Sequence, residues 1–148
     1  MQEKEDQSFH ETLLLPLESR VELLALERAN QIMMKMGDVR DNEEWQTEVR
    51  TALIEAVINA VEHSGSKSGK VEIFFEVDAD KLRIIVKDAG HGFDTAAVKP
   101  VDFREKRRRR ETRGWGLHLI REAMDTLNIE SGPQGTLLKM VKFRKGKE

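Results

Sequence analysis

The stretch "KVEIFFEVDADKLRIIVKDAGHGFD", residues 70–94, predicts two antiparallel strands followed by a glycine-rich, acidic loop. Residues 70–77 and 81–88 are rich in β-branched and aromatic side chains, and "DAD" between them is a turn signal, so the two runs are predicted to form a hairpin. The loop "DAGHGFD" has three interpretations: a plain turn, a metal-binding loop, or a backbone that lies against a nucleotide. Its acids lack the alternating spacing of an EF-hand, which disfavours calcium.

The rest of the chain predicts an α+β fold. The other predicted elements are a strand over residues 9–15 ended by a proline, helices over 18–36, 42–63 and 114–127, and a last hairpin over 128–143. Asp41, with Glu44 three residues later, fits a capping box at the start of the second helix. Helices packed on one face of a mostly antiparallel sheet is the natural architecture for this order.

Composition limits the classes of protein to consider. The 148 residues predict a single domain over residues 1–148, in which residues 1–8 form a tail. A net charge of -2 gives no support to direct nucleic-acid binding, and the absence of cysteine excludes disulfides and thiolate metal sites. No apolar stretch approaches the ~20 residues that a membrane-spanning helix needs, and the N-terminus has no apolar signal core. We therefore expect a cytoplasmic protein with no membrane partner.

The helix that contains "EAVINAVEH", residues 55–63, carries polar groups on one side. Glu55, Asn59 and His63 follow one another at intervals of four residues and share a face. The pair Glu55 and Asn59 either belongs to a solvated face or forms a site in which a carboxylate orients a nucleophile and oxygens bind a hard cation. A transition-metal site with His63 is disfavoured, because Glu, Asn and His at this spacing are not a usual ligand set. Apolar residues occupy the opposite side and are expected to face the core: Leu53, Val57, Ala60 and Val61.

The loop after residue 87 combines an acid with two glycines. Asp88 ends an apolar strand, so its carboxylate is expected to be partly buried and to need a donor, which an adenine amino group would supply. Gly90 and Gly92 would allow the backbone to approach a ligand closely. A plain turn is the alternative.

Glycines also stand before the third predicted helix and the last predicted strand. Gly114 and Gly116 would let phosphate oxygens reach the unpaired N–H groups of a helix start, or they form an ordinary turn. The spacing matches neither a Walker A loop nor a Rossmann fingerprint. Gly135 followed by Thr136 is an ordinary start for a strand when taken alone.

The run "REKRRRRETR", residues 104–113, contains six arginines and one lysine. It is either a solvated loop, a nucleic-acid contact, or a lid whose arginines neutralise phosphates or bind an acidic partner. Aromatic residues are not interleaved in it, which disfavours single-stranded nucleic acid. The lid is the favoured interpretation.

The chain resembles the ATP-binding domain of the GHKL superfamily, which DNA gyrase, a heat-shock chaperone, histidine kinases and mismatch-repair ATPases share. The resemblance rests on four short motifs that occur in the order expected for that domain. "EAVINA" resembles the N box of that superfamily, "DAGHG" its first glycine box, "GWGL" its second and "GT" its third. The resemblance implies the two-layer α/β sandwich of the Bergerat type, with an ATP lid over residues 94–113.

A narrower resemblance is to the bacterial anti-sigma-factor serine/threonine kinases. It is carried by "ALIEAVINAVEHS", "VKDAGHGFD" and "GLHLIREAMD", and it covers roughly residues 9–143. It implies a protein that binds ATP with Mg²⁺, holds a sigma factor inactive, and phosphorylates a serine or threonine of a small anti-sigma-factor antagonist protein. The alternative is a partner-switching kinase or ATP-gated binding module of the same fold that binds no sigma factor. Members of the group often form homodimers, and methionines 33, 34 and 36 would then be either a partner surface or core.

The resemblance also implies roles for individual residues. Glu55 would act as general base or orient the attacking hydroxyl, and Asn59 would bind the magnesium ion. Asp88 would accept a hydrogen bond from the adenine amino group, and Thr136 would support Asp88. His63 would line the site or cap the end of its helix.

The remaining implied ATP contacts come from two glycine-containing segments. Gly90 and Gly92 would pass under the nucleotide, with Phe93 beside them. The second segment would present backbone N–H groups and one cationic side chain to the phosphates: Arg113, Gly114, Gly116 and Leu117.

Overall fold

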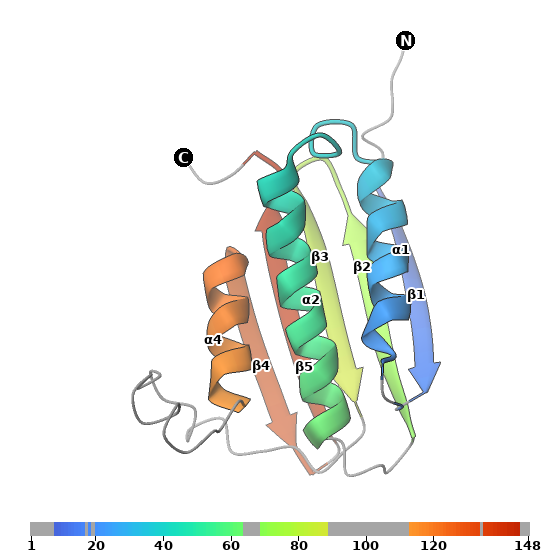
Figure 1. Cartoon of the computed structure of the whole chain (residues 1–148), viewed down its shortest axis with the longest axis vertical. Helices are drawn as coiled ribbons and strands as arrows, with labels where there is room; N and C mark the ends of the chain where they lie inside the picture. The colour runs from blue at the N-terminus through green and yellow to red at the C-terminus, as the bar shows by residue number, and fades with distance from the viewer. Residues whose placement is uncertain are drawn as a thin grey trace.

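The computed structural model describes residues 8–16, 18, 20–63, 69–88, 113–133 and 135–145, with only the backbone described for residues 63 and 113–115. This part of the chain contains five strands and three helices (Figure 1). In chain order they are β1 (Phe9–Pro16), α1 (Glu22–Met34), α2 (Glu43–His63), β2 (Lys70–Val77), β3 (Lys81–Asp88), α4 (Arg113–Ala123), β4 (Thr126–Gly132) and β5 (Gly135–Phe143).

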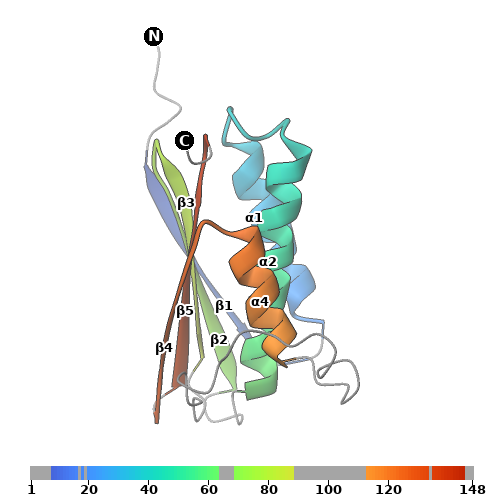
Figure 2. The ribbon, with the colours of Figure 1, turned by 90° about the vertical axis from the view of Figure 1, so that its left-hand side faces the viewer.

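The strands form one sheet in the order β1-β2-β3-β5-β4, and every neighbouring pair is antiparallel. The three helices lie on the same side of this sheet, as Figure 2 shows edge-on. The predicted α+β architecture of two layers is therefore confirmed, as are the two hairpins β2–β3 and β4–β5. None of the helices in the described ranges is long and apolar enough to cross a membrane.

The core lies between the sheet and the helices. Alternate residues of β2, β3 and β5 are buried, because successive side chains of a strand point to opposite faces and only one face is covered by helices. The largest fully buried side chains come from both layers: Phe75, Ile73, Leu82, Ile84, Leu138 and Met140 from the sheet, and Ile32, Met36, Leu53 and Ile120 from the helical side. Met33 is also core, whereas Met34 is 61% exposed.

Helix α2 begins one residue later than the predicted capping box allows. The side-chain Oδ1 of Asn42 accepts a hydrogen bond from the backbone N–H of Trp45 at 3.1 Å, so Asn42 is the capping residue. The prediction of Asp41 paired with Glu44 was wrong by one position. The Trp45 indole Nε1 also donates to the carbonyl of Phe143 at 2.8 Å, which ties the start of α2 to the end of β5.

The first and last helices are both shorter than predicted. Arg20 has a φ of 69°, which a right-handed helix does not accommodate, and α1 begins only at Glu22. Helix α4 ends at Ala123, because the N–H of Asp125 already bonds the carbonyl of Val141 in β5 at 2.8 Å. Leu127, which was expected in this helix, therefore lies in β4.

The β2–β3 turn is closed by the side chain of Asp78. Its Oδ1 accepts the backbone N–H groups of Asp80 and Lys81 at 2.8 and 2.9 Å. Desolvation works to raise the pKa of Asp78, but these hydrogen bonds and the Lys81 ammonium group outweigh it and hold that pKa below its ordinary value. The turn residues thus fix the register that carries Asp88 to the far end of β3.

Candidate functional site

The described residues of the predicted site gather at one end of the molecule. At this end β3 and β4 terminate, β5 begins, α4 begins, and α2 runs to its C-terminus (Figure 1). The end of α2 and the start of β5, which lie more than 70 residues apart in the sequence, are thus brought to a common edge. Antiparallel pairing of β3 with β5 accounts for this, because it places Asp88 directly opposite Thr136.

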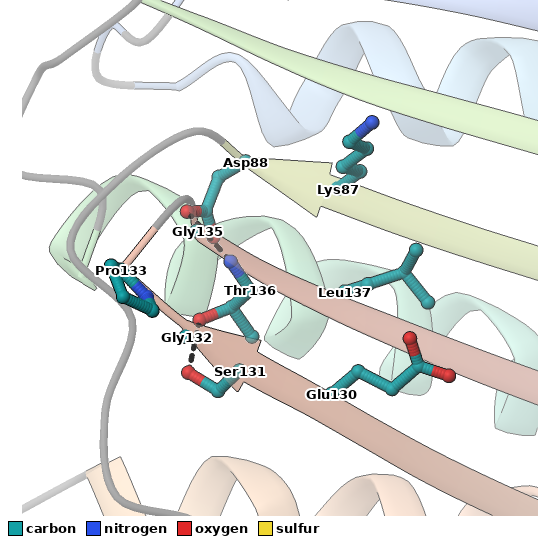
Figure 3. A pocket seen from close by; sticks show the side chains of 9 residues that line it. All are labelled: Lys87, Asp88, Glu130, Ser131, Gly132, Pro133, Gly135, Thr136 and Leu137. Atoms are coloured by element: carbon teal, nitrogen blue, oxygen red, sulfur yellow. Dashed lines mark hydrogen bonds between the residues drawn. The ribbon is translucent and has the colours of Figure 1, made fainter.

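Asp88 and Thr136 form the sheet side of the site. Asp88 is 4% exposed, and its Oδ1 accepts the backbone N–H of Thr136 at a long 3.4 Å (Figure 3). The predicted burial of this carboxylate is confirmed, and one donor is a backbone group of the third glycine box. Gly135, immediately before it, has a φ of 131°, a conformation that other residues rarely adopt, which explains why this position is glycine.

Sequence reasoning missed Ser131 at this edge. Its Oγ lies 3.0 Å from the Oγ1 of Thr136, and the two residues are paired across β4 and β5. The available signal was the tight final hairpin, since a short turn over residues 132–135 places residue 131 opposite residue 136. Ser131 therefore fixes the side-chain hydroxyl of Thr136 by a hydrogen bond. The backbone N–H of Thr136 in turn fixes the carboxylate of Asp88.

A pocket of about 320 Å³ lies where these strands end (Figure 3). This volume is at the lower end of the ~300–1,000 Å³ typical of small-molecule sites. The lining residues come from β3, β4, β5 and the turn between the last two: Lys87, Asp88, Glu130, Ser131, Gly132, Pro133, Gly135, Thr136 and Leu137. Two of the predicted site residues, Asp88 and Thr136, thus line the same hollow.

Asn59 supplies a buried oxygen without a donor. The residue is 5% exposed, and its Oδ1 has no hydrogen-bond partner within the part of the chain that the structure describes. Leaving such a group unpaired costs about 1–3 kcal/mol, so a polar ligand at this atom is favoured. An amide oxygen is a suitable ligand for a hard cation such as Mg²⁺, so the residue fits the predicted ion. Among the described residues, no group of three or more His, Cys, Asp or Glu side chains is arranged so that it could hold a metal ion.

Glu55 lies one helical turn before Asn59 on α2. Desolvation by burial raises the pKa of its carboxyl group above the ordinary value, and the negative charge of Glu62 raises it further. Helix α4 packs closely on this carboxylate: a methyl group at Gly116 would lie 3.0 Å from the Oε1 of Glu55. Both glycines of the second box lie inside the first turn of α4, whereas the sequence placed them before the helix.

Leu117 is 4% exposed and packs in the core cluster, so its side chain anchors the first turns of α4. The remaining predicted site residues cannot be placed. The loop residues Gly90, Gly92 and Phe93, the lid residues 94–112 and the side chains of His63 and Arg113 lie outside the described parts of the chain. Their roles stay predictions.

Comparison with known proteins identifies the family. A family model described as a histidine kinase-like ATPase domain matches residues 19–142. The serine-protein kinase RsbW of Staphylococcus aureus is 32% identical over 152 residues, covering 98% of this chain and 91% of that protein. RsbW from strain MSSA476 is also 32% identical, over 151 residues, covering 96% and 91%.

A solved structure supports the fold. The crystal structure of the RsbU and RsbW domains of Rv1364c from Mycobacterium tuberculosis is similar, with a TM-score of 0.65 at 14% identity, over 91% of this chain and 32% of that chain. At this identity the similarity bears on the fold alone. The match of the family model over most of the chain and the two RsbW relatives give the closer assignment: the chain belongs to the histidine kinase-like ATPase domain family and is a relative of the serine-protein kinase RsbW.

Proposed function

We propose that this protein is an ATP-dependent protein serine/threonine kinase that acts as an anti-sigma factor. It binds a sigma factor and phosphorylates a small antagonist protein of that factor. The observation that carries the proposal is the pair on α2, in which the buried oxygen of Asn59, unpaired among the described residues, lies one turn from the partly buried carboxylate of Glu55. Phosphoryl transfer depends on positioning and charge neutralisation, which a cation at Asn59 and the carboxylate of Glu55 would supply, and the relative RsbW is named a serine-protein kinase.

Asp88 reads the base of the nucleotide in this proposal. Its carboxylate is acceptor-only, so it selects a donor such as the adenine amino group. The N–H of Thr136 orients one carboxylate oxygen, and Ser131 orients the hydroxyl of Thr136. Selection by a buried acceptor is strong, because a base without the donor leaves the carboxylate unpaired.

Asn59, through a bound ion, and the first turn of α4 bind the phosphates in this proposal. The Oδ1 of Asn59 would hold a magnesium ion, and that ion would supply neutralisation of the phosphate charge. The first turn of α4 offers backbone N–H groups that have no partner within the helix, together with the positive end of the helix dipole. The buried side chains of Leu117 and Ile120 hold that turn against the core.

Glu55 accepts the proton of the attacking serine or threonine hydroxyl. Burial raises the pKa of this carboxyl group, which makes its ionised form a better base than a solvated carboxylate. The oxygen of the hydroxyl forms a bond to the γ-phosphorus as the bond to the β-phosphate oxygen breaks. ADP leaves with the electron pair of that bond, and Glu55 keeps the proton until solvent removes it.

The test uses the purified full chain, labelled ATP with Mg²⁺, and a candidate antagonist protein from the same cells. Label on a serine or threonine of the antagonist, abolished by Glu55→Ala with ATP binding retained, is the expected result. Capture of partners from the source cell with ATP or ADP present should yield a sigma factor. Capture of a phosphatase or scaffold without any sigma factor would reassign the protein to a partner-switching kinase. Failure to bind any adenine nucleotide would refute the proposal altogether.

A further inference from the structure

Gly116 of helix α4 faces the carboxylate of Glu55 closely enough that an added Cβ atom would contact it. We infer that Gly116 is a positioning residue: its missing side chain leaves the space in which α4 holds the Glu55 carboxylate for phosphoryl transfer. The inference rests on the proposed kinase function. It assigns Gly116 a second task beside the phosphate contact that the sequence pattern implies.

The geometry leaves too little room for a side chain beside the Glu55 carboxylate in its present position. A Cβ atom at Gly116 would lie 3.0 Å from the Oε1 of Glu55 and 4.0 Å from its Cβ. The shorter distance is below ordinary carbon–oxygen contact, so one of the two partners would have to move by a few tenths of an ångström.

Helix α4 is the partner that resists movement. Leu117 and Ile120, one and four residues beyond Gly116, are 4% and 0% exposed and belong to the core cluster. Withdrawing the helix from α2 would open space around these side chains, and close-packed cores tolerate that poorly. The end of the Glu55 side chain rotates at lower cost, so a side chain at residue 116 displaces the carboxylate rather than the helix.

Two other glycines with ordinary φ angles do not share this contact. Gly37, after α1, and Gly132, at the end of β4, would have no atom within 4 Å of an added Cβ. Gly132 lines the pocket, so Gly37 is the suitable control. Gly37→Ala makes the same chemical change in open space.

The first experiment separates kcat from nucleotide binding. In Gly116→Ala, transfer of labelled phosphate to the antagonist should fall about 10- to 100-fold in kcat, because displaced catalytic groups lose rate steeply. The Kd for MgATP should change less than about twofold, and the unfolding midpoint should not fall, because alanine favours helix over glycine. Gly37→Ala should match the wild type in all three. A loss of ATP affinity with unchanged kcat would overturn the inference and leave Gly116 a phosphate contact only.

The second experiment is a double-mutant cycle with Glu55→Asp. Aspartate is one methylene shorter, so its carboxylate withdraws from the contact with residue 116. Adding Gly116→Ala to Glu55→Asp should then cost less than about twofold in kcat, whereas the same change in the wild type costs 10-fold or more. Equal losses in the two backgrounds would show that the residues act independently and would overturn the inference.

A spectroscopic readout separates this inference from the proposed function. The ¹³C shift of the Glu55 side-chain carboxyl should move in Gly116→Ala and stay unchanged in Gly37→Ala. An unmoved shift overturns the inference even if the wild type is an active kinase. A wild type that transfers no phosphate refutes the proposed function instead, and the shift still decides whether Gly116 sets the position of the carboxylate.

Discussion

Replacing Asn59 with alanine should separate ion binding from folding. The amide of Asn59 is buried at 5% exposure, and its Oδ1 has no hydrogen-bond partner among the described residues. Removing an unpaired buried acceptor recovers about 1–3 kcal/mol, while loss of the packed side chain costs a comparable amount. The free energy of unfolding without ligand should therefore stay within about 1 kcal/mol of the wild-type value.

The effect on ligand binding should be large. At a ligand concentration 100 times Kd, MgATP stabilises the wild type by ~2.7 kcal/mol, which for a chain of this length raises the unfolding midpoint by roughly 8 °C. The assay compares that shift in MgATP with the shift in ATP plus EDTA. In Asn59→Ala the two shifts should coincide, because the oxygen that binds the ion is gone.

Gln46 is the matched control on the same helix. It is 8% exposed, but its Nε2 donates to the carbonyl of Val39 at 2.7 Å, so this buried amide is satisfied. Gln46→Ala should lose about 1–3 kcal/mol of stability and keep the full magnesium dependence. If Asn59→Ala were as destabilised as Gln46→Ala, or kept the magnesium dependence, the assignment of Asn59 as an ion ligand would be refuted.

Three further variants test the site and its frame. Asp88→Asn should weaken ATP binding about 10- to 100-fold, as measured by calorimetry, because a charged hydrogen bond to the base is lost. The ratio of the affinities for ATP and ITP should also decrease. An unchanged ratio would contradict the role of Asp88. The raised pKa of Glu55 means that the folded chain holds this proton more tightly than the unfolded chain, so wild-type stability falls as pH rises from 4.5 through the folded pKa. Glu55→Gln has no carboxyl group to titrate, so its free energy of unfolding should not fall in that pH window. Unfolding curves should show it increasingly more stable than the wild type as pH rises. Its phosphate transfer should drop about 10²- to 10⁴-fold. Asp38→Ala removes the carboxylate that accepts hydrogen bonds from the Arg144 guanidinium, which is 1% exposed. Because Asp38 itself is 34% exposed, the cost should be ~2–3 kcal/mol in urea unfolding, with the MgATP shift preserved.

The strands and their hairpins were predictable because each strand has one covered face. Alternation of apolar and charged residues over 70–77 and 81–88 specifies both the strands and the side that faces the helices. The ends of α4 were not predictable in the same way. Leu127 fits helical spacing after Ile120 and Met124, and it also fits the alternation of β4, so only the bond from Asp125 to β5 decides between the two.

The candidate site was predictable in its residue types and order and unpredictable in its contacts. The positions of Asp88 and Thr136 follow from the glycine boxes, but their pairing depends on which strand joins β3, and β5 rather than β4 does so. Ser131 could not be assigned to the site without the same strand order, because that order pairs it with Thr136. The approach of Gly116 to Glu55 depends on two helices that are far apart in sequence, so no local pattern encodes it.

The surroundings of α2 bear on the two interpretations of its polar face. Helix α2 lies between α1 and α4 above the sheet (Figure 1), and it contacts both helices as well as β2, β3 and β5. The side opposite Asn59 is buried as expected, with Leu53 and Val57 at 0% exposure, yet Asn59 is buried too. A helix that is covered on several sides would be expected to be apolar on all of them. A polar oxygen that has no donor among the described residues is a cost to folding, and under the proposed function the ion and phosphates of a bound nucleotide would offset it.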